Sequence, residues 1–268
     1  MRFTKMQGIG NDYIYVNCFE EKVIDPEETA RRISDRHFGA GSDGLVLICP
    51  DPDADFRMRM FNADGSESEM CGNAARCIGK YVYDRGMTNK TEISLMTGAG
   101  IKLLKINASE GITRSVRVDM GEPAVLGIGE TITAKDKTFS FSRISTGNPH
   151  AVIFLDEVDH FDVEGYGKII ENHPLFPERT NTEFARILSA DRIRMRVWER
   201  GAGETLACGT GACATLVAAA ASHLTGRKAV LELNGGNLLI EWDESTNHVF
   251  QEGPAAFVFE GVWPDSPK

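Results

Sequence analysis

Residues 71–77 read CGNAARC, and residues 208–214 read CGTGACA. In both segments a cysteine precedes a glycine and a small polar residue, and such residues open helices. The motif occurs once in each half of the chain, and the numbers of Cys71 and Cys208 differ by a fixed offset (208 − 71 = 137). Backbone N–H groups point outward at the start of a helix, where they stabilise a thiolate. We therefore expect both thiols to have lowered pKa values.

Two further pairs of segments repeat at the same offset. GNDYIYV begins at Gly10 and GNPHAVI at Gly147, while RMRMFN begins at Arg57 and RMRVWE at Arg194. Three matches at one constant offset, with no gap between them, are typical of a duplicated unit. The sequence therefore predicts two pseudo-symmetric domains that arose by internal duplication.

Each half shows the same order of strand-like and helix-like segments. The strand-like segments are apolar runs or alternate polar and apolar residues, and they cover 10–17, 56–62, 147–154 and 193–199. A helix is expected after each cysteine, closed by Gly86 in the first half and by Gly226 in the second. The second helix is apolar almost all round, so other elements must enclose it.

These patterns predict an α+β fold in which each domain wraps an antiparallel β-sheet or barrel around a central helix. The first domain is expected to cover 1–113 and a C-terminal strand, 257–268, and to carry Cys71. The second is expected to cover 114–256 and to carry Cys208. A cleft between domains is the usual place for a ligand, so we expect the active site in the interdomain cleft.

The composition argues against several classes of partner. The chain has 268 residues, of which 42% are hydrophobic and 25% charged, and its net charge is −10. Nucleic acids and anionic membranes require a concentrated basic face, so neither partner is expected. No uninterrupted apolar segment opens the chain, and the apolar stretch 214–221 is too short to span a bilayer. We expect a cytoplasmic protein with a small-molecule substrate.

The other cysteines and the histidines show no metal-binding pattern. No Cys-x-x-Cys pair occurs, and the histidines lack zinc-ligand spacing, so we expect no metal. Four cysteines lie in strand-like or helical segments without a counterpart in the repeat, and we interpret them as packing residues: Cys18, Cys49, Cys77 and Cys213.

Two equivalent thiols suit one kind of reaction. Inversion of a stereocentre requires a base on one face of a carbon and an acid on the other, so two like groups should flank the carbon. Cys71 and Cys208 would serve as thiolate and thiol and exchange roles in the reverse direction. The amides at the two helix starts would hold the substrate carboxylate, which takes up negative charge when the proton leaves: those of Gly72, Asn73, Gly209 and Thr210.

The chain resembles the diaminopimelate epimerase family over nearly its whole length. The resemblance is carried by GIGNDYIYVN (8–17), FNADGSESEMCGNAAR (61–76), GNPHAV (147–152), RTNTEF (179–184) and WERGAGETLACGTGA (198–212). It implies a cofactor-independent isomerase that interconverts LL- and meso-2,6-diaminopimelate for lysine and peptidoglycan precursor synthesis. It also implies that Cys208 takes the proton from the LL substrate, that Cys71 returns one, and that the protein is a homodimer.

The resemblance also implies roles for further residues. His150 and Glu199 would tune the thiols, and the substrate would be bound by Asn11, Asn62, Gly72, Asn73, Asn148, Asn181, Glu199, Arg200, Gly209 and Thr210. The repeat supports part of this set, because Asn11 pairs with Asn148 and Asn62 with Glu199 at the same offset. An arginine beside a carboxylate, as in Glu199–Arg200, can hold the second amino-acid end of diaminopimelate.

Two positions depart from the family pattern, and neither is expected to change the reaction. Gly44 stands where some members carry a glutamine that touches the substrate, and Thr180 stands where valine is common.

Other interpretations of the same residues remain open. The three asparagines Asn11, Asn148 and Asn181 are also typical of turns, His150 of a buried structural histidine, and Glu199–Arg200 of a surface ion pair. At the level of function, the alternatives are a racemase of the same fold acting on histidine or hydroxyproline, a non-catalytic binding protein, and a pyridoxal-phosphate racemase.

Overall fold

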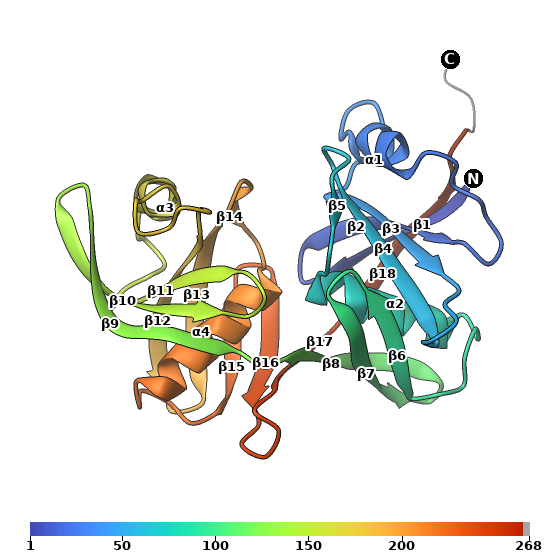
Figure 1. Cartoon of the computed structure of the whole chain (residues 1–268). Coiled ribbons are helices and arrows are strands. Elements are labelled where there is room, and N and C mark those ends of the chain that lie inside the picture. The colour runs from blue at the N-terminus through green and yellow to red at the C-terminus, as the bar shows by residue number, and fades with distance from the viewer. Residues whose placement is uncertain (265–268) are drawn as a thin grey trace. The chain divides into compact units, whose positions relative to one another are not determined.

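The computed structural model describes residues 1–264, which form two compact units (Figure 1). Unit 1 contains Met1–Val118 together with the chain from Gly253 onward, and unit 2 contains Asp119–Glu252. The last four residues of the expected C-terminal strand, 265–268, lie outside the described residues. None of the helices within the described residues is both long and apolar enough to cross a membrane.

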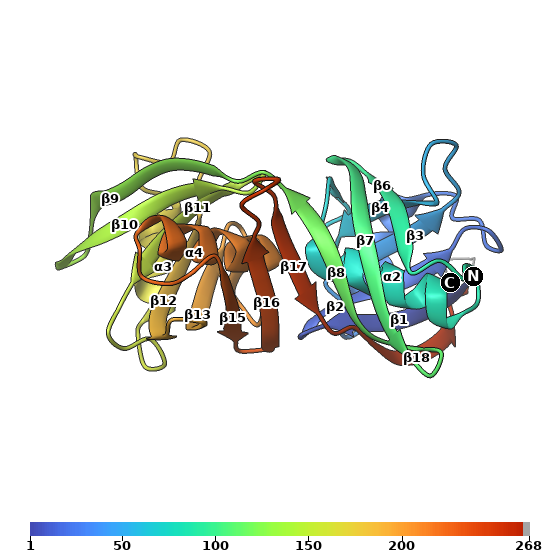
Figure 2. The same ribbon diagram turned by 90° about the horizontal axis from the view of Figure 1, so that it is seen from below.

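Unit 1 surrounds one long helix with strands. Its elements are β1 (Arg2–Gly8), β2 (Asn11–Asn17), α1 (Pro26–Ser34), β3 (Gly44–Cys49), β4 (Phe56–Asn62), β5 (Glu67–Ser68), α2 (Gly72–Asp84), β6 (Glu92–Thr97), β7 (Gly100–Ser109), β8 (Ile112–Gly121) and β18 (Ala256–Val262). β1 pairs antiparallel with β2 and with β18, so the end of the chain joins its beginning in one sheet. Figure 2 shows α2 with β7, β8, β1 and β18 around it.

Unit 2 repeats this plan. Its elements are β9 (Ala124–Ala134), β10 (Lys137–Ser145), β11 (Pro149–Phe154), α3 (Val163–Glu171), β12 (Asn181–Ser189), β13 (Arg192–Glu199), β14 (Gly203–Thr205), α4 (Gly209–Ala221), β15 (Lys228–Leu233), β16 (Gly236–Trp242) and β17 (Val249–Gly253). α4 packs against β10, β11, β12 and β16 (Figure 1). The expected duplication is confirmed, because two helix pairs share the offset of the cysteines at both of their ends: α2 with α4, and α1 with α3.

The sheets are mixed, which corrects the expectation of purely antiparallel ones. β2 pairs parallel with β3 and β4 with β6, and the equivalent parallel pairs in unit 2 are β11 with β12 and β13 with β15. Each of these pairs is joined by a crossover that contains one helix, namely α1, α2, α3 or α4. Parallel neighbours require such a crossover, because a tight turn can only return the chain antiparallel.

The central helices are enclosed as expected, but they end differently. Ten of the thirteen residues of α4 are buried, and so are eleven of those of α2. Gly86 closes the first helix with a positive φ of 69°, as predicted. Gly226 does not close the second. α4 ends at Ala221, and His223 takes the left-handed conformation (φ 58°) while the N–H of Leu224 donates to the carbonyl of Ala219.

The first unit extends further along β8 than the expected boundary after residue 113. Residues of β8 up to Val118 pair in register with β7, where Val118 lies opposite Leu104. These ladder hydrogen bonds tie the strand to unit 1, and the boundary between the two units lies after Val118.

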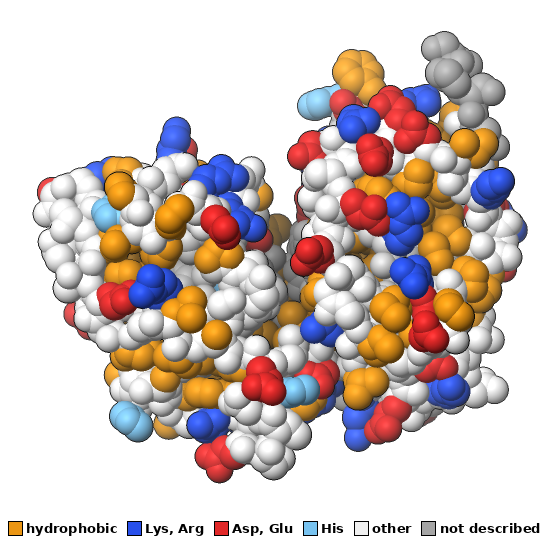
Figure 3. All heavy atoms as spheres, in the orientation of Figure 1, with side chains coloured by type: hydrophobic (Ala, Val, Ile, Leu, Met, Phe, Trp, Pro, Cys, Tyr) orange, Lys and Arg blue, Asp and Glu red, His pale blue; other side chains and the backbone are white. Residues whose placement is uncertain are grey.

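On the face shown in Figure 3, acidic and basic side chains are interspersed over both units.

Candidate functional site

In unit 1, Cys71 caps the N-terminus of α2. Its backbone is extended (φ −138°, ψ 121°), and its carbonyl accepts the N–H of Ala75. The thiol Sγ lies 3.5 Å from Oδ1 of Asn11, and Nδ2 of Asn73 donates to the same oxygen at 3.1 Å. Oδ1 of Asn73 in turn accepts from the buried Arg76 at 2.9 Å. The structure therefore brings together three predicted site residues in this unit.

The remaining predicted contact of unit 1, Asn62, lies at the end of β4. Its Nδ2 donates to Oγ of Ser66 at 3.0 Å, within the turn that leads to α2. Gly44 lies opposite Asn62 in the β3–β4 ladder, and a Cβ atom there would come within 2.1 Å of the carbonyl oxygen of Phe61. A larger residue at position 44 would require a backbone shift, so the departure from the family pattern has a packing consequence.

In unit 2, Cys208 occupies the equivalent cap of α4. Its Sγ accepts from the N–H of Gly211 at 3.4 Å and lies 3.5 Å from Oγ1 of Thr210. Burial nevertheless raises the pKa of Cys208 well above that of an ordinary thiol, and the negative charges of Glu199 and Glu183 raise it further. The expectation of a lowered pKa is wrong for this thiol, because the helix amides offset only part of the lost hydration.

Glu199 ends β13 and faces Cys208. One carboxylate oxygen accepts from the hydroxyl of Thr205, and the carboxyl group lies near enough to Cys208 for its negative charge to raise the pKa of that thiol. Burial raises the pKa of Glu199, with the charge of Glu183 acting in the same direction. A carboxylate with a raised pKa is a stronger base, so this contact suits transfer of the thiol proton.

His150 on β11 and Glu183 on β12 form a fully buried pair. Nδ1 of His150 lies 2.7 Å from Oε1 of Glu183, and both side chains have an exposed fraction of 0%. Nε2 of His150 lies 2.8 Å from Oδ1 of Asn148, an oxygen that can only accept. Both ring nitrogens thus face acceptor groups, and the imidazole reaches Cys208 through Asn148 and Thr210.

Each unit has the same kind of polar contact at the start of its central helix. Nδ2 of Asn148 donates to Oγ1 of Thr210 at 3.3 Å, and the equivalent pair in unit 1 is Asn11 with Asn73. Asn11 is the first residue of β2 and Asn148 directly precedes β11, the equivalent strand of unit 2, and each partner is the second residue of the helix. The repeat therefore preserves the surroundings of the thiols as well as the thiols themselves.

Arg200 and Asn181 meet beside this cluster. The N–H of Arg200 donates to Oδ1 of Asn181 at 3.0 Å, and Nδ2 of Asn181 donates to the carbonyl of Pro149 at 2.9 Å. The guanidinium of Arg200 is exposed and donates to the carbonyl of Glu178 at 3.0 Å, while the carboxylate of Glu199 accepts from the hydroxyl of Thr205. Glu199 and Arg200 are therefore neighbours with separate partners.

Sequence reasoning missed two acidic residues of the site. Glu183 lies within a run of five buried residues at the start of β12, and Asp43 accepts from Nδ2 of Asn11 at 2.8 Å. Burial raises the pKa of Asp43, and the charge of Asp12 adds to this. An acidic residue inside an otherwise buried strand is the signal that could have identified Glu183, because an unpaired buried carboxylate is unfavourable.

The four cysteines interpreted as packing residues are all at least partly removed from solvent. Cys77 and Cys213 are fully buried inside α2 and α4, and Cys18 and Cys49 are partly buried against the core of unit 1.

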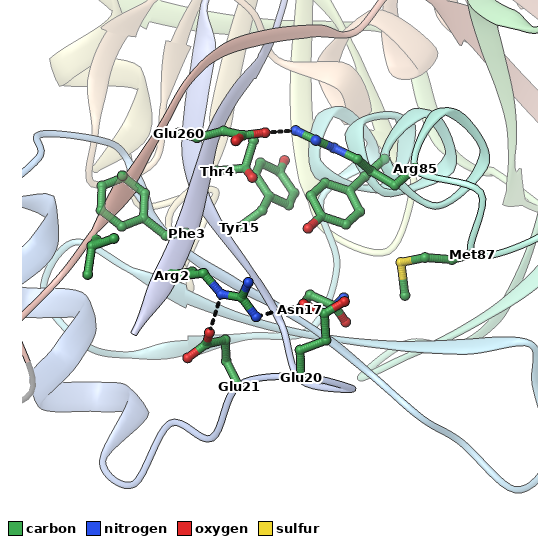
Figure 4. Close-up of a pocket in the computed structure, with 13 residues that line it drawn as sticks. Arg2, Phe3, Thr4, Tyr15, Asn17, Glu20, Glu21, Arg85, Met87 and Glu260 are labelled. Carbon is green, nitrogen blue, oxygen red and sulfur yellow. Dashed lines mark hydrogen bonds and ion pairs between the residues drawn. The ribbon is translucent and has the colours of Figure 1, made fainter.

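A surface pocket of about 430 Å³ in unit 1 contains none of the predicted site residues. Figure 4 shows Arg2 directed at Glu21 and Arg85 directed at Glu260, and Arg2 also pairs with Glu20. The charged groups that line this pocket are thus paired with one another. Both arginines among the lining residues are bound to glutamates, so neither is free to bind the carboxylate of a ligand.

Comparison with known proteins gives consistent matches along the chain. The family model described as diaminopimelate epimerase matches residues 3–126 and 142–258. A diaminopimelate epimerase of Acetivibrio thermocellus is 56% identical over 97% of this chain and 98% of its own length. One of Methanococcus maripaludis is 53% identical over 97% of this chain and 99% of its own length.

Two solved structures of lower identity share the fold. A hydroxyproline epimerase from Agrobacterium vitis superposes with a TM-score of 0.73 at 14% identity, covering 97% of this chain and 90% of its own. A PhzF family phenazine biosynthesis protein from Bacillus anthracis gives 0.75 at 16% identity, covering 97% and 98%. At these identities the likeness concerns the fold alone.

Proposed function

This chain belongs to the diaminopimelate epimerase family, a family of isomerases, and from that premise we propose that it interconverts LL- and meso-2,6-diaminopimelate. The observation that carries the proposal is the equivalence of the two thiols. Cys71 and Cys208 cap helices whose bounds are related by the constant offset, and each lies beside an asparagine–helix contact that the repeat preserves. Such equivalence suits two groups that act on opposite faces of one carbon.

The proposed reaction moves one proton off the α-carbon and another on. Cys208 gives its proton to Glu199, and the thiolate then removes the α-proton of the LL substrate. Cys71 delivers a proton to the other face and completes the inversion. The raised pKa values support this order, because the Cys208 thiol keeps its proton in the free enzyme and needs a base, and the raised pKa of Glu199 makes that carboxylate a better proton acceptor.

The helix starts supply the stabilisation that the reaction needs. Removal of an α-proton places negative charge on the substrate carboxylate, and amides at a helix N-terminus are oriented to receive it. The amides in question belong to Gly72 and Asn73 in unit 1 and to Gly209 and Thr210 in unit 2. This proposal requires both helix starts to contact the same substrate molecule.

The second amino-acid end of the substrate needs a separate set of contacts. Arg200 has an exposed guanidinium that can bind the distal carboxylate, and Asn181 already fixes its backbone. Asn11, Asn62 and Asn148 present amides from the ends of strands and complete the polar surface. A racemase of a smaller amino acid would have no use for the Arg200 contact, which is why we favour diaminopimelate.

We further propose that the enzyme needs no cofactor, acts in the cytoplasm in lysine and peptidoglycan precursor synthesis, and functions as a homodimer. Exposed apolar side chains on β18 support self-association: Val258 is 53% exposed, Phe259 43% and Val262 75%.

The decisive test is an assay with purified protein and either LL- or meso-diaminopimelate, followed by chiral separation of the products. Equilibration from both sides supports the proposal. Racemisation of histidine or hydroxyproline without turnover of diaminopimelate would contradict it. A visible Schiff-base absorption band in the active protein would contradict the absence of a cofactor.

A further inference from the structure

We propose that Glu171, the last residue of α3, is a positioning residue that holds the Glu199–Arg200 segment in the conformation in which it meets the substrate. The role of that segment rests on the proposed function above, while the contacts that hold it are features of unit 2 alone. Glu171 is 4% exposed, so its carboxylate is almost completely removed from solvent.

The carboxylate of Glu171 binds on both sides of the segment. Oε2 accepts from Nε1 of Trp198 at 2.6 Å, and Oε1 accepts from the N–H of Gly201 at 2.9 Å. Oε1 also lies 3.1 Å from Nη1 of Arg179. Both oxygens therefore receive N–H donors, one from the residue before Glu199 and one from the residue after Arg200. One rigid group fixes the two ends of the dipeptide.

The helix that carries Glu171 is itself held firmly against the segment. Gly167 lies one turn earlier on α3, and a Cβ atom there would come within 2.4 Å of Cβ of Trp198. The helix backbone therefore rests directly on Trp198, with no room for a side chain between them. At the other end of α3, Oδ1 of Asp162 caps the helix by accepting from Gly165 N–H at 2.9 Å.

Besides Glu171, the segment is held by the pairing of Glu199 with Gly203 in the β13–β14 ladder and by single hydrogen bonds. The N–H of Ala202 donates to the carbonyl of Glu199 at 3.1 Å and closes a turn, and Asn181 accepts the N–H of Arg200. Arg200 itself is exposed. Each of these contacts holds one point of the segment, whereas the carboxylate of Glu171 binds a donor on either side of the Glu199–Arg200 dipeptide.

The repeat shows that folding alone does not require this carboxylate. At the constant offset of the repeat, Glu171 corresponds to Ser34 and Arg179 to Ser42. In unit 1 these positions form a neutral contact, in which Oγ of Ser42 donates to Oγ of Ser34 at 3.1 Å. The topology thus forms with two serines, and burying a carboxylate is less favourable than burying a hydroxyl. The charged pair, Glu171 with Arg179, occurs in the unit that carries Arg200.

The test compares Glu171→Gln with Glu164→Gln, which removes an exposed carboxylate from the same helix. A glutamine presents one amide nitrogen where an acceptor is needed, so one of the two anchors is lost. Hydrogen exchange in the free protein should then accelerate at the amides of 199–202 by about ten-fold. Hydrogen exchange at the amides of β15 and β16, which serve as the internal control, should stay at the wild-type rate. KM for diaminopimelate should rise about ten-fold with a smaller change in kcat.

A second variant places the residues of unit 1 at the equivalent positions of unit 2 and controls for misfolding. Glu171→Ser combined with Arg179→Ser restores the serine pair, so the unit should fold while KM rises as in Glu171→Gln. Adding Glu171→Gln to Arg200→Met should raise KM little further, since the group to be positioned is gone.

Three results would overturn the proposal: wild-type exchange at 199–202 in Glu171→Gln, faster exchange spread evenly over unit 2, or equal effects of Glu171→Gln and Glu164→Gln on KM. The exchange measurement needs no substrate. If the wild type failed to epimerise diaminopimelate, the proposed function would fail, and the anchoring of the segment would still be decided.

Discussion

Nδ1 of His150 lies 2.7 Å from Oε1 of Glu183, and the two side chains are completely buried in unit 2. Parallel pairing of β11 with β12 brings them together, because His150 lies opposite Asn181 and Glu183 follows two residues later on the same face. Oε2 of Glu183 has no hydrogen-bond partner among the described residues. The pair is therefore sensitive to the loss of either member.

His150→Ala should destabilise the protein by about 3–5 kcal/mol, because it leaves a buried carboxylate without its partner. Adding Glu183→Gln should recover part of this loss, since a neutral amide needs less hydration than a carboxylate. Urea denaturation of the single and double variants measures both effects. A loss below about 1 kcal/mol for His150→Ala would show that the carboxylate has another partner.

Each single replacement of a thiol, Cys71→Ala or Cys208→Ala, should abolish epimerisation, because inversion requires a group on each face of the carbon. Calorimetry should still detect binding of diaminopimelate, since the helix amides remain. With wild-type enzyme in D2O, deuterium should enter chiefly the inverted product in early turnover. An active alanine variant, or product that retains substrate hydrogen, would support one shuttling base instead.

Arg200→Met should lower kcat/KM for diaminopimelate by a factor that corresponds to a loss of about 2–4 kcal/mol in transition-state stabilisation, because the distal carboxylate loses its cation. Arg200→Lys should recover only part, since an ammonium cannot form the two parallel hydrogen bonds of a guanidinium. Steady-state kinetics with both variants gives the comparison. Unchanged values in both would make Arg200 a surface residue and weaken the assignment of the substrate.

Glu199→Gln should have opposite effects on the reactivity of Cys208 and on catalysis. Burial and the charge of Glu199 raise the pKa of Cys208, so the free enzyme should be alkylated slowly at pH 8 and faster as pH rises. Removing the charge should lower the pKa and speed alkylation at pH 8, while epimerisation falls because the proton acceptor is lost. Iodoacetamide kinetics followed by mass spectrometry measures the first effect. Slower alkylation in Glu199→Gln would be incompatible with the charge as a cause of the raised pKa.

The sequence by itself determined the duplication and its consequences. The two cysteine motifs, the matching strands and the constant offset predict two related units, and the strand expected at 56–62 is β4, with the same bounds. Residue types near the cysteines predict helix starts, and both thiols are N-caps. These features follow from local periodicity and capping chemistry, which depend on neighbours along the chain.

The tertiary structure alone decided how the surroundings of the thiols act. The raised pKa of Cys208 depends on burial and on Glu183 and Glu199, none of which can be deduced from the motif around the thiol. Glu171 reaches Trp198 and Gly201 because α3 packs on β13 and β14. Parallel pairing through helical crossovers and the desolvation of buried carboxylates join residues far apart in sequence, and hydration and charge are set by what surrounds a group in space.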